Sequence, residues 1–332
     1  MNEVDCSIII PMYNCEKYIG HCLDSLIGMN IPLSQYEVIV VNDGSTDNSA
    51  SVVQKYVAEY PNIRYIEQKN QGISAARNAG FHVCKGQYVY FVDADDFVFS
   101  ASLEFAIRTI KEMELEVLEI GRVSGSEAEL AIIIPRIGRS DLTVVKGYDL
   151  VKEGVMFFVT SFIFKKSFLV QNNLLFQSVY AYEDVCFVVT ALLQSESAAS
   201  LRTLQVYAYV LRSESVSHNG GKIKYREFAD AIINVRSYTD NLINESPFLP
   251  DSVAKIIKDK TNTYTFYLAN RIIRFCPYDY FKYIYNRLRS LNYLPIARMD
   301  GLHGFKWNII RFVVNHKWLF FIARFFIRPF YR

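Results

Sequence analysis

The chain has 332 residues, of which 51% are hydrophobic, 15% aromatic and 21% charged, and its formal net charge is +2. This apolar fraction is sufficient for a folded core and excludes a wholly disordered protein. The near-neutral charge argues against a nucleic-acid-binding protein, which would need a strongly basic face.

The six cysteines are scattered and form no C-x-x-C pair. This spacing favours reduced thiols in the cytoplasm over a disulfide framework or a zinc site. No apolar run is long enough to cross a bilayer, and the N-terminal MNEVDCSIII lacks the basic region of a signal peptide. We therefore expect neither a membrane span nor a leader.

The first hundred residues alternate between strand and helix patterns. Apolar or β-branched runs predict strands at 6–10, 37–41, 63–67 and 88–92. Helical spacing of apolar residues separates them, and Asn14 is a candidate cap of the first helix. Apolar strands that alternate with helices predict an α/β fold with a doubly wound, mostly parallel sheet of the Rossmann-like type.

Beyond residue 115 the pattern is less regular. The segments VLEIGRV and QVYAYVLR predict strands, and residues 184–194 predict a helix. The last third is helical in pattern and punctuated by prolines, which predicts a C-terminal helical extension. Its predicted helices cover 226–244, 252–275 and 278–291.

Three polar segments each follow a predicted strand: PMYN, NDGSTD and DADD. Ligands of open α/β sheets bind outside the carboxyl ends of the strands, so we expect the three segments to converge. The DADD segment places three carboxylates in four residues, which suits Mg²⁺ or Mn²⁺ shared with substrate phosphates. Asp43, in NDGSTD, can accept a hydrogen bond from a nucleobase imide. The alternative for DADD is an acidic turn that caps the next helix, and the alternative for NDGSTD is an ordinary Asx turn.

Five blocks together resemble the family-2 glycosyltransferases of the GT-A fold, as found in bacterial polysaccharide and glycolipid biosynthesis. They are SIIIPMYNCEKYI, VIVVNDGSTDNS, NQGISAARNAG, YVYFVDADD and AYEDVCF, in the family's order over about residues 5–218. The resemblance implies a GT-A catalytic domain at 1–218, followed by a helical extension at 219–332. Within the domain, 1–115 would bind the nucleotide sugar and 116–218 the acceptor.

The resemblance also implies roles for individual residues. Those assigned to the UDP-sugar donor are Pro11, Tyr13, Glu16, Asp43, Arg77, Asp93 and Ala94. Pro11, Tyr13 and Glu16 would line the nucleobase side, and Asp43 would bond the uracil imide. Arg77 would reach toward the uracil or the diphosphate, although a surface ion pair is the alternative.

The remaining assignments concern metal and catalysis. Asp95 would ligate Mn²⁺ or Mg²⁺, with His218 completing the shell, unless His218 is a solvent-exposed loop residue. Asp184 would be the catalytic base of an inverting transfer to a glycan or lipid-linked acceptor. The alternative for Asp184 is a helix N-cap, with Glu183 favouring the helix dipole.

Residues 301–332 contain six Lys or Arg, ten aromatic residues and no Asp or Glu. This tail carries +6, so the preceding 300 residues carry −4. The pattern favours an amphipathic helix on an anionic membrane surface, and hence a peripheral protein on the cytoplasmic face of the inner membrane. The alternatives are a helix packed on the protein's own body and, less compatible with an acidic body, contact with nucleic acid.

Two rival functions have sequence signatures of their own. A nucleotidyltransferase that makes sugar nucleotides would carry a Gly-rich, basic phosphate loop after the first strand, where this chain has no glycine before Gly20. A non-catalytic, membrane-associated protein with the same fold would be expected to lack Asp95 or Asp184, and both are present.

Overall fold

The computed structural model describes residues 4–135, 142–178, 182–212, 225–275, 277–296 and 305–327. The chain divides into two compact units. The first consists of Met1–Ser178 and Glu183–Asn219, and the second of Val179–Tyr182 and Gly220–Arg332. The five cysteines in the described ranges are all free.

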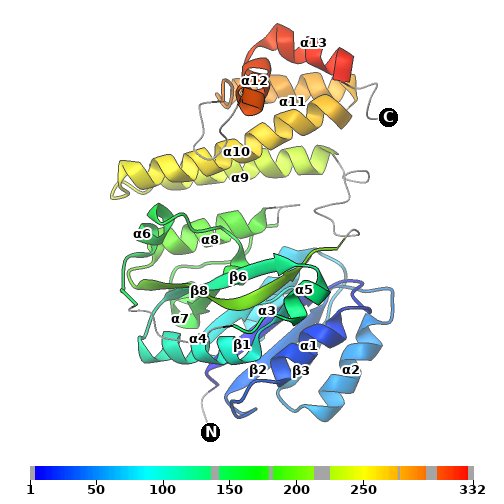
Figure 1. Cartoon of the computed structure of the whole chain (residues 1–332), viewed down its shortest axis with the longest axis vertical. Helices are drawn as coiled ribbons and strands as arrows, with labels where there is room; N and C mark the ends of the chain where they lie inside the picture. The colour runs from blue at the N-terminus through cyan, green and yellow to red at the C-terminus, as the bar shows by residue number, and fades with distance from the viewer. Residues whose placement is uncertain are drawn as a thin grey trace. The chain divides into compact units, whose positions relative to one another are not determined.

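An eight-stranded sheet organises the first unit, in the order β3-β2-β1-β4-β7-β6-β8-β5 (Figure 1). The strands are β1 (Cys6–Met12), β2 (Tyr36–Asn42), β3 (Ile63–Glu67), β4 (Tyr88–Phe91), β5 (Phe97–Val98), β6 (Val117–Gly125), β7 (Phe162–Lys165) and β8 (Ala198–Val210). β1 pairs in parallel with β2 and β4, β2 with β3, and β6 with β8. Among the strands in the described part of the chain, the pairs made by β7 and by the two-residue β5 are antiparallel, so the predicted α/β fold with a mostly parallel sheet is confirmed.

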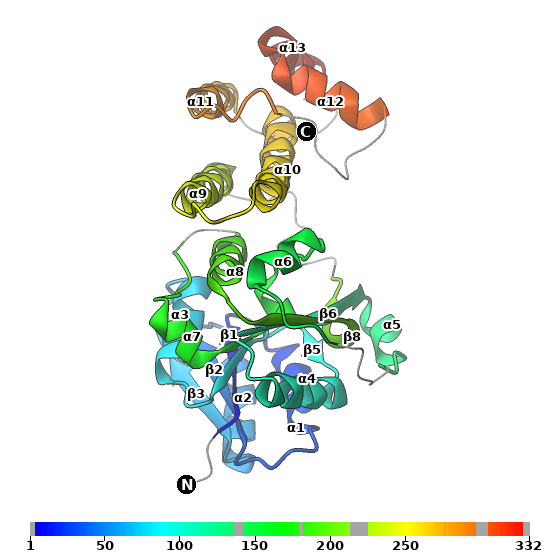
Figure 2. The same ribbon diagram turned by 90° about the vertical axis from the view of Figure 1, so that its left-hand side faces the viewer.

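Helices cover both faces of this sheet. They are α1 (Ile19–Ile27), α2 (Ser49–Glu59), α3 (Ile73–Val83), α4 (Ser100–Glu112), α5 (Glu127–Ala131), α6 (Gly147–Lys152), the 3-10 turn η1 (Val159–Ser161), α7 (Lys166–Gln171) and α8 (Glu183–Gln194). Figure 2 shows α1 and α4 on one side of the sheet and α6 and α8 on the other. This layering buries every residue of β1, which explains why its sequence is apolar without alternation.

The two faces of β1 pack differently. Ile8 and Ile10 belong to a core cluster with Leu23 of α1, whereas Ile9 faces α3. A Cβ atom at Gly80 of α3 would lie only 2.4 Å from Ile9 Cγ2. Glycine is therefore needed at this position for α3 to lie directly on β1.

The prediction that Asn14 caps the first helix is wrong. α1 begins at Ile19, and its N-cap position, Tyr18, makes no side-chain capping bond. Asn14 instead has a left-handed backbone, with φ of 52°, and its side-chain oxygen accepts a hydrogen bond from Thr46 N at 2.8 Å. The side chain thus links the loop after β1 to the loop after β2 instead of capping α1.

The second unit contains five helices in its described part, which confirms the C-terminal helices. They are α9 (Tyr225–Asn244), α10 (Asp251–Phe275), α11 (Tyr278–Ser290), α12 (Phe305–Asn315) and α13 (Lys317–Ile327). α9 and α10 lie side by side, and their core includes Ile232, Phe266, Phe281 and Phe320. None of the described helices is both long and apolar enough to cross a membrane.

Candidate active site

The polar segments predicted to converge leave the same edge of the sheet. β1 lies between β2 and β4, with Met12 opposite Asn42 and Ile9 opposite Phe91. Because the three strands are parallel, the segments that follow them, at 11–14, 42–47 and 93–96, emerge side by side. The topological prediction from the sequence is thus confirmed.

Hydrogen bonds join the loop after β1 to the loop after β2. Glu16 N donates to Asp47 Oδ2 at 3.0 Å, and Glu16 Oε2 accepts from Asn48 N at 2.9 Å. Pro11 is buried within β1, whereas Tyr13 is exposed at the strand edge. Tyr13 therefore offers an aromatic surface to a ligand here, while Glu16 stabilises the loop. Their predicted contacts with a nucleobase remain predictions.

Asp43 is buried and organises the loop that precedes α3. Its Oδ1 accepts from Gln68 Nε2 at 2.7 Å and from Gln71 N at 2.9 Å, and its Oδ2 accepts from Gly72 N at 2.8 Å. A carboxylate has about four acceptor positions, and three of those of Asp43 are filled by these bonds. The predicted bond to uracil is compatible with this geometry and remains a prediction.

Arg77 lies at the centre of a buried charge cluster. Its Nη2 lies 2.9 Å from Asp93 Oδ1, and its Nη1 lies 2.8 Å from Glu183 Oε1 and 3.4 Å from Asp184 Oδ1. We call Arg77, Asp93, Glu183 and Asp184 the Arg77 cluster; it joins α3, the end of β4 and the start of α8. The guanidinium is completely buried, so the alternative of a surface ion pair is wrong. Its predicted reach toward uracil or diphosphate remains a prediction.

The two carboxylates at the start of α8 differ in exposure. The Glu183 side chain is 9% exposed and the Asp184 side chain 23%, and Asp184 Oδ2 accepts from Val159 N at 3.3 Å. One guanidinium cannot neutralise three neighbouring carboxylates. Burial first, and then the charge of Asp184, therefore raise the pKa of Glu183 to about 8, against the opposing effect of Arg77. α8 begins at Glu183, so Asp184 lies in its first turn and is not its N-cap.

The third carboxylate of the DADD segment has a structural role. Asp96 is buried and accepts from Tyr207 Oη at 2.5 Å and from Val210 N at 2.9 Å, which bonds it to β8. Burial, reinforced by Asp93 and Asp95, raises the pKa of Asp96 to about 7. Asp96 thus holds β8 against the end of β4.

Asp95 is the outward-facing member of the same segment. Its side chain is 43% exposed and lies 3.2 Å from Arg212 Nη1, whose guanidinium stacks on Tyr18 at 4.1 Å. Asp93 is held by Arg77, and Ala94 between the two acids is buried. Asp95 is nevertheless partly buried, which raises its pKa, and the charge of Asp93 adds to this effect. Within the DADD segment Asp95 is the most exposed of the three carboxylates.

The described ranges contain no group of three His, Cys, Asp or Glu that could hold a metal ion. His218 lies outside the described residues. A divalent ion at a nucleotide site commonly uses one or two carboxylates and takes its other oxygens from phosphates and water. The partly exposed Asp95 offers one such carboxylate, and a metal ion there would compete with Arg212 for its oxygens.

Sequence reasoning missed one member of the site, Glu183, and one residue that lies beside Arg77 in sequence, Asn78. It treated Glu183 only as a residue favouring the helix dipole, although its side chain belongs to the Arg77 cluster. It gave no role to Asn78, whose Nδ2 donates to Phe176 O at 2.8 Å and whose Oδ1 accepts from Phe176 N at 2.9 Å. The adjacent acids of the EDV segment and the asparagine next to Arg77 were the available signals.

The structure thus combines a mostly parallel α/β sheet with acidic residues at its strand ends. Residues 7–167 match the model of glycosyl transferase family 2. The resemblance of this chain to the family-2 glycosyltransferases of the GT-A fold is thereby confirmed.

One known protein is similar to this chain in sequence, and two solved structures are similar to it in fold. The chain is 31% identical over 210 residues to the poly(ribitol-phosphate) beta-glucosyltransferase of Bacillus spizizenii, covering 62% of this chain and 32% of that protein. TarS 1–349 of S. aureus, in complex with UDP-GlcNAc, superposes with a TM-score of 0.62 at 22% identity, over 88% of this chain and 80% of that one. The mannosyltransferase PcManGT of Pyrobaculum calidifontis, in complex with GDP-Man and Mn²⁺, gives a TM-score of 0.57 at 13% identity, over 98% and 87%.

The chain spans less than two thirds of the length of the curated relatives that it matches, between 32% and 62% for three of them. The likeness to the two solved structures shows the fold.

Proposed function

We propose that this chain is an inverting glycosyltransferase that moves a sugar from a UDP-sugar to a glycan or lipid-linked acceptor in bacterial surface-polysaccharide assembly. The observation that carries the proposal is the Arg77 cluster, which brings Asp184 of α8 to the edge where the nucleotide-binding loops end. A relative that is a poly(ribitol-phosphate) beta-glucosyltransferase and a neighbour bound to UDP-GlcNAc support the reaction class and the donor.

Asp184 acts as the general base in this proposal. The acceptor hydroxyl oxygen attacks the anomeric carbon from the face opposite the diphosphate, the bond from that carbon to the diphosphate oxygen breaks, and Asp184 takes the hydroxyl proton. One displacement inverts the anomeric configuration. Val159 N and Arg77 orient the Asp184 carboxylate, and its partial exposure leaves it accessible to an acceptor.

The donor lies along the strand ends in this proposal. Tyr13 and Pro11 flank the nucleobase, Asp43 accepts its imide proton, and Asp93 and Ala94 lie against the ribose or sugar. Glu16 supports the nucleobase side through its bond to Asn48 N. Arg77 acts by holding Asp93 in position. Its contact with Asp93 supports this role better than direct binding of the diphosphate.

Asp95 and His218 would hold Mn²⁺ or Mg²⁺, which when bound neutralises the charge that develops on the leaving diphosphate. Arg212 already lies against Asp95 and adds positive charge on the same side. A neighbour of the same fold that binds GDP-Man and Mn²⁺ supports a divalent ion in this chain.

The proposal is tested by incubating a set of UDP-sugars and p-nitrophenyl glycosides with the protein and Mn²⁺. Released UDP and the transferred sugar are measured by mass spectrometry, and donor binding by thermal shift, because a bound donor stabilises by mass action. We expect Asp184→Asn to keep donor binding and to lower turnover by roughly 10²–10⁴. The matched control is Asp149→Asn, an exposed Asp in α6 that pairs with Lys152.

Other outcomes would favour a different role for Asp184 or one of the two rival functions. Wild-type turnover in Asp184→Asn would remove Asp184 as the base. Release of pyrophosphate in place of UDP would favour the nucleotidyltransferase. Donor binding without turnover in the wild-type protein would favour the non-catalytic alternative.

The metal assignment has its own measurement. We expect Mn²⁺ to strengthen UDP binding to the wild-type protein and EDTA to reverse this, because Asp95 and the phosphates share the ion. Asp95→Asn should abolish the Mn²⁺ dependence, whereas Asp149→Asn should retain it. Equal UDP affinity with Mn²⁺ and with EDTA in the wild-type protein would contradict the assignment.

We also propose that the C-terminal helices contact an anionic membrane, on the cytoplasmic face. One side of α12 and α13 packs into the core of the second unit through Val314 and Phe320. This side agrees with the alternative that the tail packs on the protein itself. Trp318, 79% exposed, and the exposed Phe312 and Ile322 remain available to a bilayer interface.

The membrane proposal is tested by cosedimentation with phosphatidylglycerol and phosphatidylcholine vesicles. We expect the wild-type protein to bind the anionic vesicles and Trp318→Ala/Ile322→Ala to lose most of that binding. Phe248→Ala is the control, because Phe248 is 95% exposed and lies outside the tail. A wild-type protein that ignores anionic vesicles would rule out this role.

A further inference from the structure

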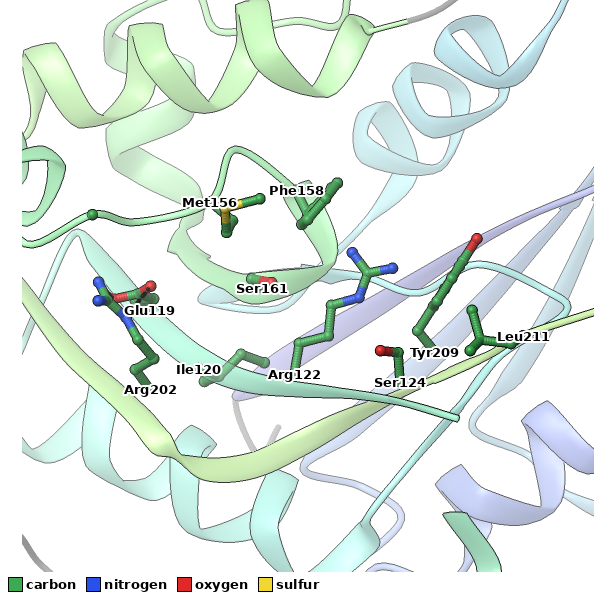
Figure 3. Close-up of a pocket in the computed structure, with 11 residues that line it drawn as sticks. Glu119, Ile120, Arg122, Ser124, Met156, Phe158, Ser161, Arg202, Tyr209 and Leu211 are labelled. Atoms are coloured by element: carbon green, nitrogen blue, oxygen red, sulfur yellow. Dashed lines mark hydrogen bonds and ion pairs between the residues drawn. The ribbon is translucent and has the colours of Figure 1, made fainter. Parts of the chain in front are cut away.

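A pocket of about 430 Å³ lies in the first unit, against β6 and β8 (Figure 3). Its floor comes from the two strands, and the segment that leads into η1 supplies Met156 and Phe158 on the opposite side. Two arginines, Arg122 and Arg202, and one carboxylate, Glu119, are its charged members.

The pocket borders the proposed catalytic residues on two sides. Phe158 lines it, and the next residue, Val159, donates its N–H to Asp184. Leu211 lines it as well, and the next residue, Arg212, pairs with Asp95. The pocket is therefore lined by the sequence neighbours of two residues: Val159, which bonds the proposed base Asp184, and Arg212, which pairs with the proposed metal ligand Asp95.

The two arginines of the pocket differ in their counter-charges. Arg202 Nε and Nη2 each lie 2.9 Å from an oxygen of Glu119, so this pair is neutral. Arg122 has no carboxylate within ion-pair distance among the described residues. The charged lining therefore has one uncompensated positive charge, and it belongs to Arg122.

Aromatic rings hold the Arg122 guanidinium in place. Its central carbon lies 4.2 Å from the ring centroids of both Phe158 and Tyr209, and 5.8 Å from that of Tyr207. Figure 3 shows the guanidinium between Phe158 and Tyr209, extending from β6 toward the η1 segment. Contact with a ring face leaves the N–H edge of a guanidinium free and does not cancel its charge.

We propose that this pocket binds an anionic group, a carboxylate or a phosphate, on the acceptor of the transfer reaction. The planar fork of Arg122 matches either group in a bidentate manner, and the rings restrict the fork to one orientation. The acceptor class is then an acidic glycan or polyol, such as a uronate or a phosphodiester. This inference rests on the proposed function, because it assigns the pocket to the acceptor of that reaction.

The test measures binding of three simple probes in the presence of saturating UDP and Mn²⁺, which occupy the donor side. The probes are D-glucose, D-glucuronate and glucose 6-phosphate, which share a ring and differ in the group at C6. We expect the wild-type protein to bind at least one charged probe about 10–100-fold more tightly than glucose, as measured by calorimetry or ligand-observed NMR. Preference for glucuronate would indicate a uronate acceptor, and preference for the phosphate a phosphodiester.

Variants assign that preference to Arg122. Arg122→Gln should remove it, and Arg122→Lys, which keeps the charge but not the planar fork, should retain only part of it. Arg108→Gln is the matched control, because Arg108 lies on the surface of α4 and pairs with Glu104. Equal binding of glucose and both charged probes to the wild-type protein would overturn the proposal, and so would an undiminished preference in folded Arg122→Gln.

Failure of the proposed function gives a different result. A protein that is not a UDP-sugar transferase releases no UDP and transfers no sugar in the assay of the proposed function, whatever its affinity for glucuronate or glucose 6-phosphate. A transferase with a neutral acceptor transfers sugar in that assay and shows no preference among the three probes.

Discussion

Arg77 and Arg122 occupy opposite electrostatic settings in the first unit. Arg77 is buried among three carboxylates from two other elements, whereas Arg122 faces a pocket with no carboxylate partner among the described residues. Both guanidiniums also lie against aromatic rings, Phe176 for Arg77 and Phe158 for Arg122. Their counter-charges, rather than their residue type, distinguish an arginine that stabilises the site from one that is available to a ligand.

The difference has an energetic meaning. A buried ion pair is costly to break, because removal of one partner leaves an uncompensated charge in a poorly solvated place. Arg122 is only partly buried and has no carboxylate partner among the described residues, so its removal orphans no carboxylate there. Substitution of the two arginines should therefore affect different properties, folding for Arg77 and ligand binding for Arg122.

The largest expected effect is that of Arg77→Met on stability. Methionine preserves the apolar stem but leaves three carboxylates without their cation, which should cost about 3–5 kcal/mol in the free energy of unfolding. Urea denaturation measures it, with Arg108→Met as the control, where loss of an exposed pair should cost about 1 kcal/mol or less. An Arg77→Met protein as stable as that control would show that the Arg77 cluster does not hold the site together.

A second effect concerns pH and tests whether one carboxyl of the Arg77 cluster keeps its proton. The pKa of Glu183 is raised to about 8 in the folded chain, compared with 4.5 for an unperturbed glutamate such as that of the unfolded chain. The folded form then binds a proton that the unfolded form has lost, so the Glu183 contribution to stability falls as the pH rises from 4.5 to about 8.

Glu183→Gln mimics the protonated side chain and should flatten this part of the stability profile, measured by urea denaturation at several pH values. The control is Glu196→Gln, an exposed Glu that pairs with Lys146. If Glu183→Gln and wild type have the same slope between pH 4.5 and 8, Glu183 is ionised and Arg77 carries three charged partners.

The smallest expected effect is that of Arg122→Met on stability. The side chain loses its cation–π contacts with Phe158 and Tyr209 but keeps its apolar stem, so the loss should be about 1 kcal/mol. The same urea titration used for Arg77→Met measures it. A loss as large as that of Arg77→Met would remove the contrast between the two arginines and indicate a structural role for Arg122.

Local sequence pattern accounts for most of the fold of the first hundred residues. Apolar runs predicted the first four strands, because buried parallel strands require them, and strand-end turns placed Asp43 and the DADD segment at one edge. Asn14 shows the limit of this reasoning within a single loop. Its side chain could cap a helix by sequence, but it bonds Thr46, which is distant in sequence and close in space.

The sequence by itself determined the α/β fold, the family and the edge of the sheet where polar residues gather, because these follow from periodicity and from motifs of neighbouring residues. Only the tertiary structure decided which charges meet. Glu183 lies 106 positions from Arg77 in the chain, and Arg122 is enclosed by rings from the η1 segment and β8. A local pattern cannot specify such pairs, since packing of distant elements determines whether a charge finds a partner or remains free for a ligand.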